Sequence, residues 1–320
     1  MKHHAQRGRI SETTKVLKKA SLIQLSVCSC VSIYLYLRKY AKFELSHTYP
    51  GRHWIPPAKY ASDWLVITTV CVDEGDKLAP DGQENAVKNY MHHTMSNHAA
   101  YARKHGYPYI PLTRAFSELS SKDVRYHKLG WVRQLLSNFT WVFYTDCDSL
   151  FIDFCVDIAQ WPKEVENSPG GHDVALILTG DRKWAMNSGQ FFMRNVLWSH
   201  RLLKQAALQP RNTHGCVGND NAAFNWLLWL DCNITHGDFT TWWNDTSKCQ
   251  RMVKNSIHAT KLACAPMNTY PQHVSEAKRR GPLFRVHFAG SQSQKLRLVE
   301  KYLQLVQYAE DCACSDIECI

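Results

Sequence analysis

The chain has 320 residues, of which 45% are hydrophobic, and its 38 Lys and Arg exceed its 28 Asp and Glu by a formal net charge of +10. This composition excludes a disordered chain and suffices for one large or two small α/β domains. Nine of the basic residues and one acidic residue lie within residues 1–42, so the remainder is close to balanced. Bulk charge is therefore only a weak argument for a nucleic-acid partner, and we expect none.

An uncharged segment occupies residues 20–37. As a helix, it would rise about 27 Å, enough to cross a thin bilayer. More Lys and Arg precede than follow it, which places its amino-terminal side in the cytosol. A cleaved signal peptide is the alternative, although no small-residue cleavage site follows. We expect a cytosolic tail (1–19), a transmembrane signal anchor (20–37), a proline-containing stem (38–60), and a lumenal globular part in the Golgi or endoplasmic reticulum.

N-glycosylation acceptors and cysteines support a lumenal location. Acceptor triplets begin at Asn138, Asn233 and Asn244, and ten of the 12 cysteines follow the uncharged segment. The cysteines show no zinc-binding spacing, which favours disulfides or buried thiols whose pairing the sequence does not define. We expect Cys147 to pack inward, and a cysteine-containing tail is expected at 312–320.

The globular part, residues 61–311, opens with an apolar strand at 63–71 that lacks alternation and is followed by acidic residues. In α/β nucleotide binders, the loop after the first strand holds the base and ribose, which makes Thr68 and Thr69 candidate contacts. Neither a G-x-G-x-x-G nor a Walker A pattern is present, so dinucleotide and P-loop functions are disfavoured.

Two helices are predicted next, at 83–104 and 126–136, with Gly106 ending the first and a short second strand at 107–110 between them. Four histidines without zinc-binding spacing lie in or after the first helix, and we expect surface or capping roles for His92, His93, His98 and His105. In the second helix, Lys128 either reaches a bound diphosphate or is solvated.

The central stretch, residues 141–153, begins with five aromatic and β-branched residues, which is typical of a strand buried on both faces. Asp146 and Asp148 follow this strand directly. Two unpaired carboxylates at the carboxyl end of a buried strand would repel each other, so Mg²⁺ or Mn²⁺ with a bound diphosphate is the natural partner. The alternative is an ordinary strand-end turn.

A third buried strand is predicted at 173–179. In residues 184–195 small polar residues interrupt an apolar run, and Gly189 would let the backbone approach a ligand; an ordinary turn into a strand is the alternative. Helices are predicted at 196–207 and 219–230. At the start of the second, Asp220 either interacts with the helix dipole or faces the site.

The last predicted elements are a strand at 284–290 and an amphipathic helix at 294–310. The strand contains His287, flanked by apolar residues. It is either a core histidine or the third ligand of an Asp/Asp/His site for Mn²⁺.

In this order, the D-x-D pair, Met186-Asn187-Ser188-Gly189, the acidic helix start and His287-Phe288-Ala289-Gly290 resemble glycosyltransferase family 34 from about Trp64 to Tyr302. The resemblance implies a GT-A fold, with one Rossmann-like, mixed and mostly parallel sheet flanked by helices. It also implies a nucleotide-sugar donor, UDP-sugar favoured over GDP-sugar, Mn²⁺ rather than Mg²⁺, and retention at the anomeric carbon.

Matching the family's motifs assigns three sets of residues. The metal ligands are Asp146, Asp148 and His287. The groups near the reacting carbon are Asp220, Asn187 and Gln190. The donor-binding residues are Thr68, Thr69, Lys128, Asp146, Ser188, Gly189, Gly290 and Lys295.

The chain departs from the family at two places. Asn219 and Asn221 stand where the family usually has aspartate and glutamine, which puts acceptor preference and rate in doubt. Ser291 and Gln292 replace a cysteine and a phosphate-binding lysine, for which Lys295 is the candidate substitute.

The leading hypothesis is a retaining, Mn-dependent transferase that moves a sugar, galactose favoured, to an oligosaccharide or glycoprotein glycan. A mannosyl- or xylosyltransferase is the alternative within the family. A noncatalytic glycan-binding subunit, in a homo- or hetero-oligomer with other glycosyltransferases, is the alternative outside enzymes, and a metal-dependent phosphodiesterase is a weaker one.

Overall fold

The computed structural model describes residues 64–72, 87–119, 124–179, 187–209, 220–231, 258–262, 268–275, 277, 283–289 and 294–310. All of them fall within one unit, residues 56–320. The expected anchor and stem, the acceptors at Asn233 and Asn244, and the tail at 312–320 lie outside the described residues. No helix within the described ranges combines the length and apolar character needed to cross a bilayer.

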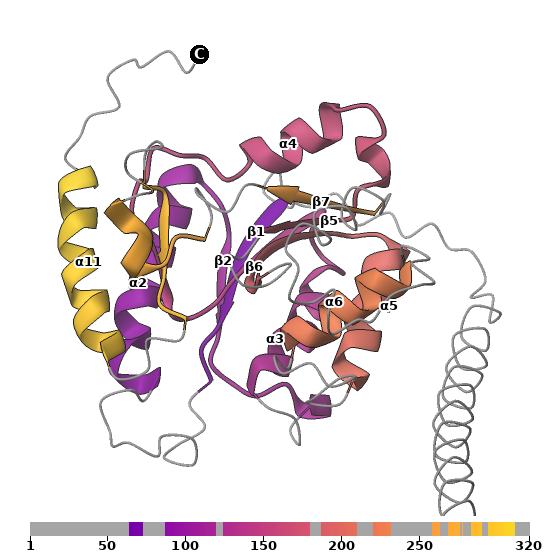
Figure 1. Cartoon of the computed structure of the whole chain (residues 1–320), viewed down its shortest axis with the longest axis horizontal. Coiled ribbons are helices and arrows are strands. Elements are labelled where there is room, and N and C mark those ends of the chain that lie inside the picture. Colours follow the sequence, from indigo (N-terminus) through magenta and orange to yellow (C-terminus); the bar gives the residue numbers. More distant parts are fainter. Residues whose placement is uncertain are drawn as a thin grey trace, which may run out of the picture. The chain divides into compact units, whose positions relative to one another are not determined.

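A six-stranded sheet forms the centre of the described fold, with strand order β2-β1-β3-β6-β5-β7 (Figure 1). Its strands are β1 (Leu65–Val70), β2 (Tyr109–Leu112), β3 (Trp141–Thr145), β5 (Leu176–Thr179), β6 (Asn187–Arg194) and β7 (Ala259–Leu262). β1 pairs in parallel with β2 and β3, and β5 with β7, whereas β6 is antiparallel to β3 and β5. The expected mixed, mostly parallel sheet is confirmed.

The strands β1, β3 and β5 are buried at every position, as their lack of alternation predicts. β2 begins two residues later than the predicted second strand, and it contains Pro111. Proline is tolerated there because β2 is at the edge of the sheet that the described strands form.

A second, two-stranded sheet pairs β4 (Ser149–Phe151) with β8 (Arg285–His287) in antiparallel register, so that Ser149 lies opposite His287. The resemblance implied a single sheet, and this is corrected. The acidic turn at 146–148 separates β3 from β4, and β4 pairs with β8 instead of with a strand of the main sheet. The last strand is also shorter than the predicted 284–290.

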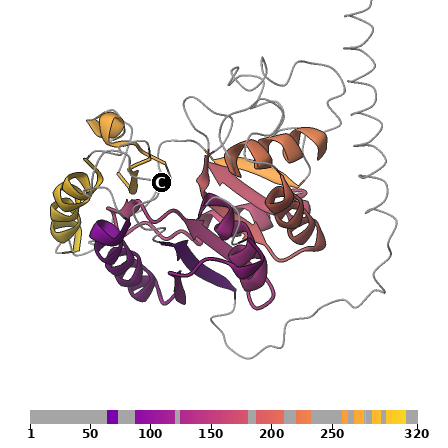
Figure 2. The same cartoon turned by 90° about the horizontal axis from the view of Figure 1, so that it is seen from below.

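The described helices form two groups (Figures 1 and 2). The first contains α3 (Val124–Leu135), α5 (Leu197–Leu208) and α6 (Asp220–Asp231), which contact one another in the order α3, α5, α6. The second contains α2 (Val87–His105) and α11 (Lys295–Glu310), which contact each other and β4. The remaining elements are α4 (Gln160–Asn167) and the short 3₁₀ segments η3 (Ser117–Leu119), η4 (Gly171–Asp173) and η6 (Pro271–His273).

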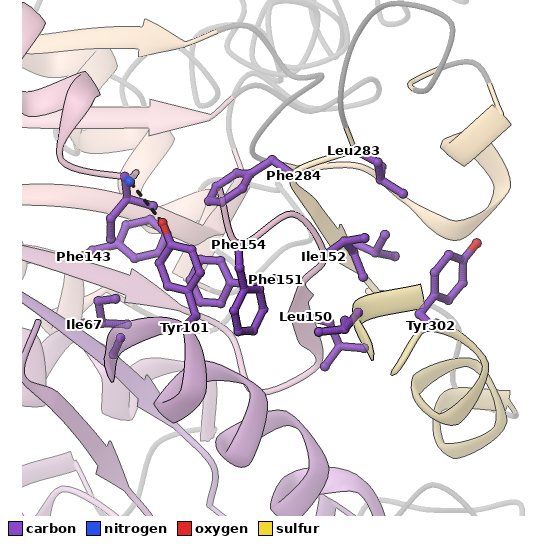
Figure 3. Close-up of a cluster of buried hydrophobic side chains, with 14 of the residues drawn as sticks. Ile67, Tyr101, Phe143, Leu150, Phe151, Ile152, Phe154, Leu283, Phe284 and Tyr302 are labelled. Carbon is purple, nitrogen blue, oxygen red and sulfur yellow. Dashed lines mark hydrogen bonds between the residues drawn. The ribbon is translucent and has the colours of Figure 1, made fainter. Parts of the chain in front are cut away.

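An aromatic cluster joins the two sheets and α2 (Figure 3). The Tyr101 ring of α2 stacks on Phe151 of β4 with centroids 3.8 Å apart, and Phe151 also contacts Phe143 of β3 and Phe284 beside β8. Large aromatic contacts of this kind supply much of the packing energy of a core. The small sheet is therefore part of the core, and this packing supports the paired residues Ser149 and His287 at one end of it.

Candidate metal centre

The ends of three strands bring Asp146, Asp148 and His287 together. One ligand atom from each side chain lies within 4.8 Å of the others. Asp146 follows β3, Asp148 precedes β4, and His287 ends β8. The Asp148 carbonyl accepts a 2.8 Å hydrogen bond from the Phe288 amide, which joins the acidic turn to the strand that carries the histidine. The structure thus brings the three expected residues together, and their role as metal ligands stays a prediction.

The imidazole of His287 is oriented for a cation. Its Nδ1 lies 2.9 Å from Asn268 Oδ1, which selects the tautomer with a proton on Nδ1. Its Nε2 is buried, lacks a hydrogen-bond partner among the described residues, and lies 3.3 Å from Asp148 Oδ1 and 3.7 Å from Asp146 Oδ2. A lone pair facing two carboxylates is unfavourable unless a cation lies between them, so these residues fit a divalent metal.

Gly189, in β6, leaves room for this group. A Cβ added there would lie 2.5 Å from Asp146 Oδ2 and 2.7 Å from His287 Cε1. The backbone of Gly189 also holds the turn, because its carbonyl accepts a 2.7 Å hydrogen bond from the Asp146 amide. The nearest neighbours of this position are the side chains of Asp146, Asn187 and His287, and the expected approach of the Gly189 backbone to a ligand stays a prediction.

Lys128, on α3, is buried between two carboxylates. Its Nζ lies 2.7 Å from Asp220 Oδ2 and 3.3 Å from Asp146 Oδ1, and donates to the Ser188 carbonyl at 2.9 Å. Burial lowers the pKa of Lys128, but the charges of Asp146 and Asp220 outweigh it, so the pKa is raised overall. The solvated alternative for Lys128 is excluded, since the side chain is 3% exposed.

Asp220, the first residue of α6, faces this cluster and not solvent. Besides its ion pair with Lys128, it accepts a short hydrogen bond from Ser188 Oγ. The next residue, Asn221, accepts a 2.6 Å hydrogen bond from the Ser188 amide through Oδ1. The amide at 221, one of the departures from the family, therefore has a defined partner; Asn219 lies outside the described residues.

The other two residues expected near the reacting carbon, Asn187 and Gln190, are buried in β6. Asn187 accepts from the Gly189 amide at 2.7 Å and donates to the Tyr270 hydroxyl at 2.9 Å. Gln190 Nε2 lies 3.4 Å from Asn268 Oδ1, the atom that orients His287. Both amides are thus part of the hydrogen-bond network around the metal ligands, and their catalytic roles stay predictions.

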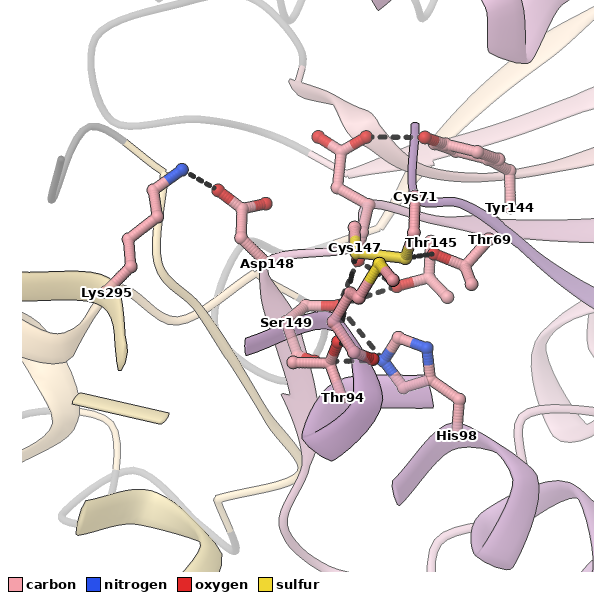
Figure 4. The surroundings of a disulfide bond; sticks show 12 residues. Thr69, Cys71, Thr94, His98, Tyr144, Thr145, Cys147, Asp148, Ser149 and Lys295 are labelled. Atoms are coloured by element: carbon pink, nitrogen blue, oxygen red, sulfur yellow. Dashed lines mark hydrogen bonds and ion pairs between the residues drawn. A yellow bond between two sulfur atoms is a disulfide. The ribbon is translucent and has the colours of Figure 1, made fainter. Parts of the chain in front are cut away.

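Lys295, the first residue of α11, contacts the opposite side of the acidic pair (Figure 4). Its Nζ lies 2.6 Å from Asp148 Oδ2. Burial opposes both charges, but their attraction prevails: the pKa of Lys295 is raised, and the Lys295 ammonium holds the pKa of Asp148 well below its usual range. Gly290, Ser291 and Gln292 lie outside the described residues.

The two threonines expected to contact the nucleotide are buried in β1. Thr68 Oγ1 donates to the Ile110 carbonyl of β2 at 2.8 Å, and Thr69 Oγ1 lies 3.9 Å from Cys71 Sγ. The structure does not bring them to the metal ligands, and their role in donor binding stays a prediction.

A buried basic pair, His98 and Arg285, lies behind the acidic turn. Arg285 donates to Thr145 Oγ1 and, at 2.5 Å, to Ser149 Oγ, and burial lowers its pKa to about 9. His98 Nε2 lies 2.9 Å from the Ser149 carbonyl, and burial together with Arg285 lowers its pKa to about 3. The surface or capping role expected for His98 is wrong, because contacts across 51 positions place it in the core. No sequence pattern indicated either role.

A disulfide joins Cys71, just after β1, to Cys147 between the two aspartates. The predicted inward packing of Cys147 is confirmed, and its partner is new. The register of the sheet explains the bond: Thr68 pairs with Tyr144, and each cysteine follows its strand partner by three residues. Two cysteines at equal offsets beyond neighbouring parallel strands are placed to bond.

Comparison with known proteins agrees with the family inferred from the motifs. Residues 62–161 match the model of the galactosyl transferase GMA12/MNN10 family. Proteins named Probable glycosyltransferase 3 from Oryza sativa subsp. indica and subsp. japonica are 29% identical over 151 residues, which are 46% of this chain and 31% of theirs. The chain therefore aligns with about a third of the length of these relatives.

Two solved structures are similar at lower levels. A glycosyltransferase involved in glycosylation of the major capsid of PBCV-1 has 13% identity and a TM-score of 0.44, with 74% of this chain and 99% of that chain covered. The galactosyltransferase LgtC, in complex with donor and acceptor sugar analogs, has 10% identity and a TM-score of 0.40, with 76% and 95% covered.

Proposed function

We propose that the chain, whose residues 62–161 match the model of the galactosyl transferase GMA12/MNN10 family, is a metal-dependent glycosyltransferase of the GT-A type. It would move a sugar, galactose favoured, from a UDP-sugar to a glycan acceptor with retention and an α-linkage. One observation carries the proposal: the Nε2 of His287, which has no hydrogen-bond partner among the described residues, faces two carboxylates at the end of a buried strand. This donor set suits Mn²⁺ and a diphosphate.

The chemistry follows from which residues would hold which charges. A divalent cation bound by Asp146, Asp148 and His287 would neutralise negative charge on the departing nucleoside diphosphate. Lys295, 2.6 Å from Asp148, is close enough to exchange this carboxylate for a phosphate oxygen once a donor binds. Because Lys128 is held by Asp220, Asp146 and Ser188, we assign it to positioning Asp146, with no phosphate contact.

Asp220 would act on the opposite side of this network. Its charge is balanced by Lys128, so it would orient Ser188 and the adjoining β6 backbone, on which Asn187 and Gln190 face the reacting sugar. An ion-paired carboxylate is a poor nucleophile. We therefore favour attack by an acceptor hydroxyl over a covalent intermediate on Asp220.

A lumenal reaction in the Golgi or endoplasmic reticulum is part of the proposal. The uncharged segment at 20–37 and the acceptor triplets support it. Asn138 is exposed in the turn after α3, where a glycan would be accommodated. The Cys71–Cys147 disulfide adds support, because such bonds persist in oxidising compartments.

Release of nucleoside diphosphate by the purified chain tests the proposal, across UDP- and GDP-sugars with Mn²⁺ or with chelator. We expect metal-dependent release from one donor, with loss of at least about 100-fold in Asp148→Ala. Asp173→Ala is the matched control, because Asp173 is an exposed aspartate in η4, and it should keep the wild-type rate.

The donor panel also separates the alternatives. Release from GDP-mannose or UDP-xylose would identify a mannosyl- or xylosyltransferase. A folded chain that binds UDP or GDP but releases nothing would be a noncatalytic subunit. Metal-dependent hydrolysis of diphosphate esters irrespective of the sugar would indicate a phosphodiesterase and contradict the proposal.

A further inference from the structure

The Cys71–Cys147 disulfide lies inside the candidate metal centre. Cys147 is the single residue between Asp146 and Asp148, so its peptide groups connect the two carboxylates that face His287. Both sulfurs are buried in the layer beneath the acidic turn, near Thr69 and Thr94 (Figure 4). A covalent bond at this point acts on the metal ligands directly.

The disulfide joins β1 to the acidic turn beyond the last paired residues of β1 and β3. β1 and β3 pair from Leu65 opposite Trp141 to Thr68 opposite Tyr144. Beyond this, β1 stays with β2, and the Cys71 amide donates to the Leu112 carbonyl at 2.8 Å. The disulfide brings the Cα atoms of residues 71 and 147 to 5.2 Å across the gap. The acidic turn is thereby held covalently to the end of β1.

Each residue of the acidic turn has a different attachment. The Asp146 amide donates to Gly189 of β6, and the Asp148 carbonyl accepts from Phe288 after β8. Cys147 is attached to the end of β1 by the disulfide. Three consecutive residues are therefore held from three separate segments, and loss of the disulfide removes the attachment of the middle residue to β1.

We propose that Cys71 and Cys147 are positioning residues of the metal centre, and that their disulfide sets the affinity of Asp146, Asp148 and His287 for a divalent cation. The inference rests on the proposed function only in that it requires the metal. If the disulfide only stabilised the fold, its removal would change the unfolding temperature but leave the metal affinity of the folded protein unchanged.

Reduction provides the reversible test of the bond. A water-soluble phosphine cleaves the sulfur–sulfur bond, is oxidised to its phosphine oxide with oxygen from water, and leaves two thiols that take up the two protons. The two sulfurs then become non-bonded and must move apart. Because Cys147 is between the ligands, this movement alters the separation and direction of both carboxylates.

The experiment measures the Kd for Mn²⁺ by the loss of the free-ion electron paramagnetic resonance signal. It compares the whole chain, oxidised and after phosphine reduction and anaerobic desalting, with C71S/C147S at a temperature well below unfolding. We expect binding about tenfold or more weaker in the reduced protein and in the unreduced double variant. Reduction should not weaken the double variant further. The control C155S, which changes an exposed cysteine outside the Cys71–Cys147 disulfide, should match the wild type.

Equal Kd values for oxidised wild type and unreduced double variant, with both folded by near-ultraviolet circular dichroism, would overturn the inference. Loss on reduction in wild type without loss in the double variant would also overturn it, since another of the 12 cysteines would be responsible. Failure of the oxidised protein to bind Mn²⁺ would instead remove the metal centre, and the proposed function with it. C71A/C147A repeats the test should the serine variant not fold.

Discussion

The two sides of the acidic turn hold their carboxylates with lysines of very different surroundings. On the side of the main sheet, Lys128 is 3% exposed and contacts Asp146, Asp220 and Ser188. On the side of α11, Lys295 is 14% exposed, its carboxylate partner is Asp148, and it follows a stretch outside the described residues. Lys128 is held by three partners at once, whereas we have proposed that Lys295 exchanges its carboxylate for a phosphate.

The comparison shows that lysine–carboxylate ion pairs on the two sides of the acidic turn can have different roles. A buried lysine among several acceptors is costly to disturb, because each carboxylate left behind would be an uncompensated buried charge. A lysine with one partner at the start of a helix loses little when it moves to a phosphate of the same charge. The predicted effects of replacing the two lysines therefore differ in kind as well as in size.

The largest effect is expected for Lys128→Met. The free energy of unfolding should fall by about 3–5 kcal/mol, because Asp220 loses its buried counter-charge. Urea unfolding measures this, with Lys104→Met, an exposed lysine near the end of α2, as control. Adding Asp220→Asn should recover part of the loss, since both charges are then gone. A Lys128→Met protein as stable as the control would show that the network is not closed.

Acid should lower the stability of the fold through His98, which lies behind the acidic turn. Neither lysine should contribute, because the pKa of each is raised. The pKa of His98 is lowered from 6.5 to about 3, so the unfolded chain binds more protons in between, and stability falls as the pH falls through this window. At pH 4 the loss should be about 3 kcal/mol.

Unfolding between pH 7 and pH 4 measures the share of His98. His98→Gln can still donate to the Ser149 carbonyl but does not titrate, so it should lose less stability than wild type over this range. His172→Gln, which changes a 79% exposed histidine, should retain the wild-type loss. Identical pH profiles for His98→Gln and wild type would exclude His98 as the source.

The smallest effect is expected for Lys295→Met. Mn²⁺ binding should tighten by about threefold, because a competitor for Asp148 is removed, whereas UDP binding in the presence of Mn²⁺ should weaken by a similar factor. Calorimetric titration measures both. Weaker Mn²⁺ binding in this variant would show that Lys295 supports the metal centre, contrary to its proposed exchange between partners.

Local sequence patterns were sufficient to predict most of the described helices and strands. The unalternating runs predicted the buried strands β1, β3 and β5, and Gly106, with φ at +73°, ends α2 as predicted. Boundaries shifted by one to four residues, as at β2 and α2, where several residues are compatible with either state. The acidic pair and His287 were identifiable because charged and imidazole groups are unusual next to apolar strands.

The sequence by itself determined the buried strands β1, β3 and β5, the acidic pair that follows β3, and the resemblance to a family. Only the tertiary structure decided that β4 and β8 form a sheet of their own, that Lys128 contacts Asp146 and Asp220 while Lys295 contacts Asp148, and that Cys71 bonds to Cys147. The physical reason is distance along the chain. Burial periodicity and capping act over a few residues, whereas Lys295 and Asp148 are 147 positions apart and the two cysteines 76, so these contacts exist only once the sheets have formed.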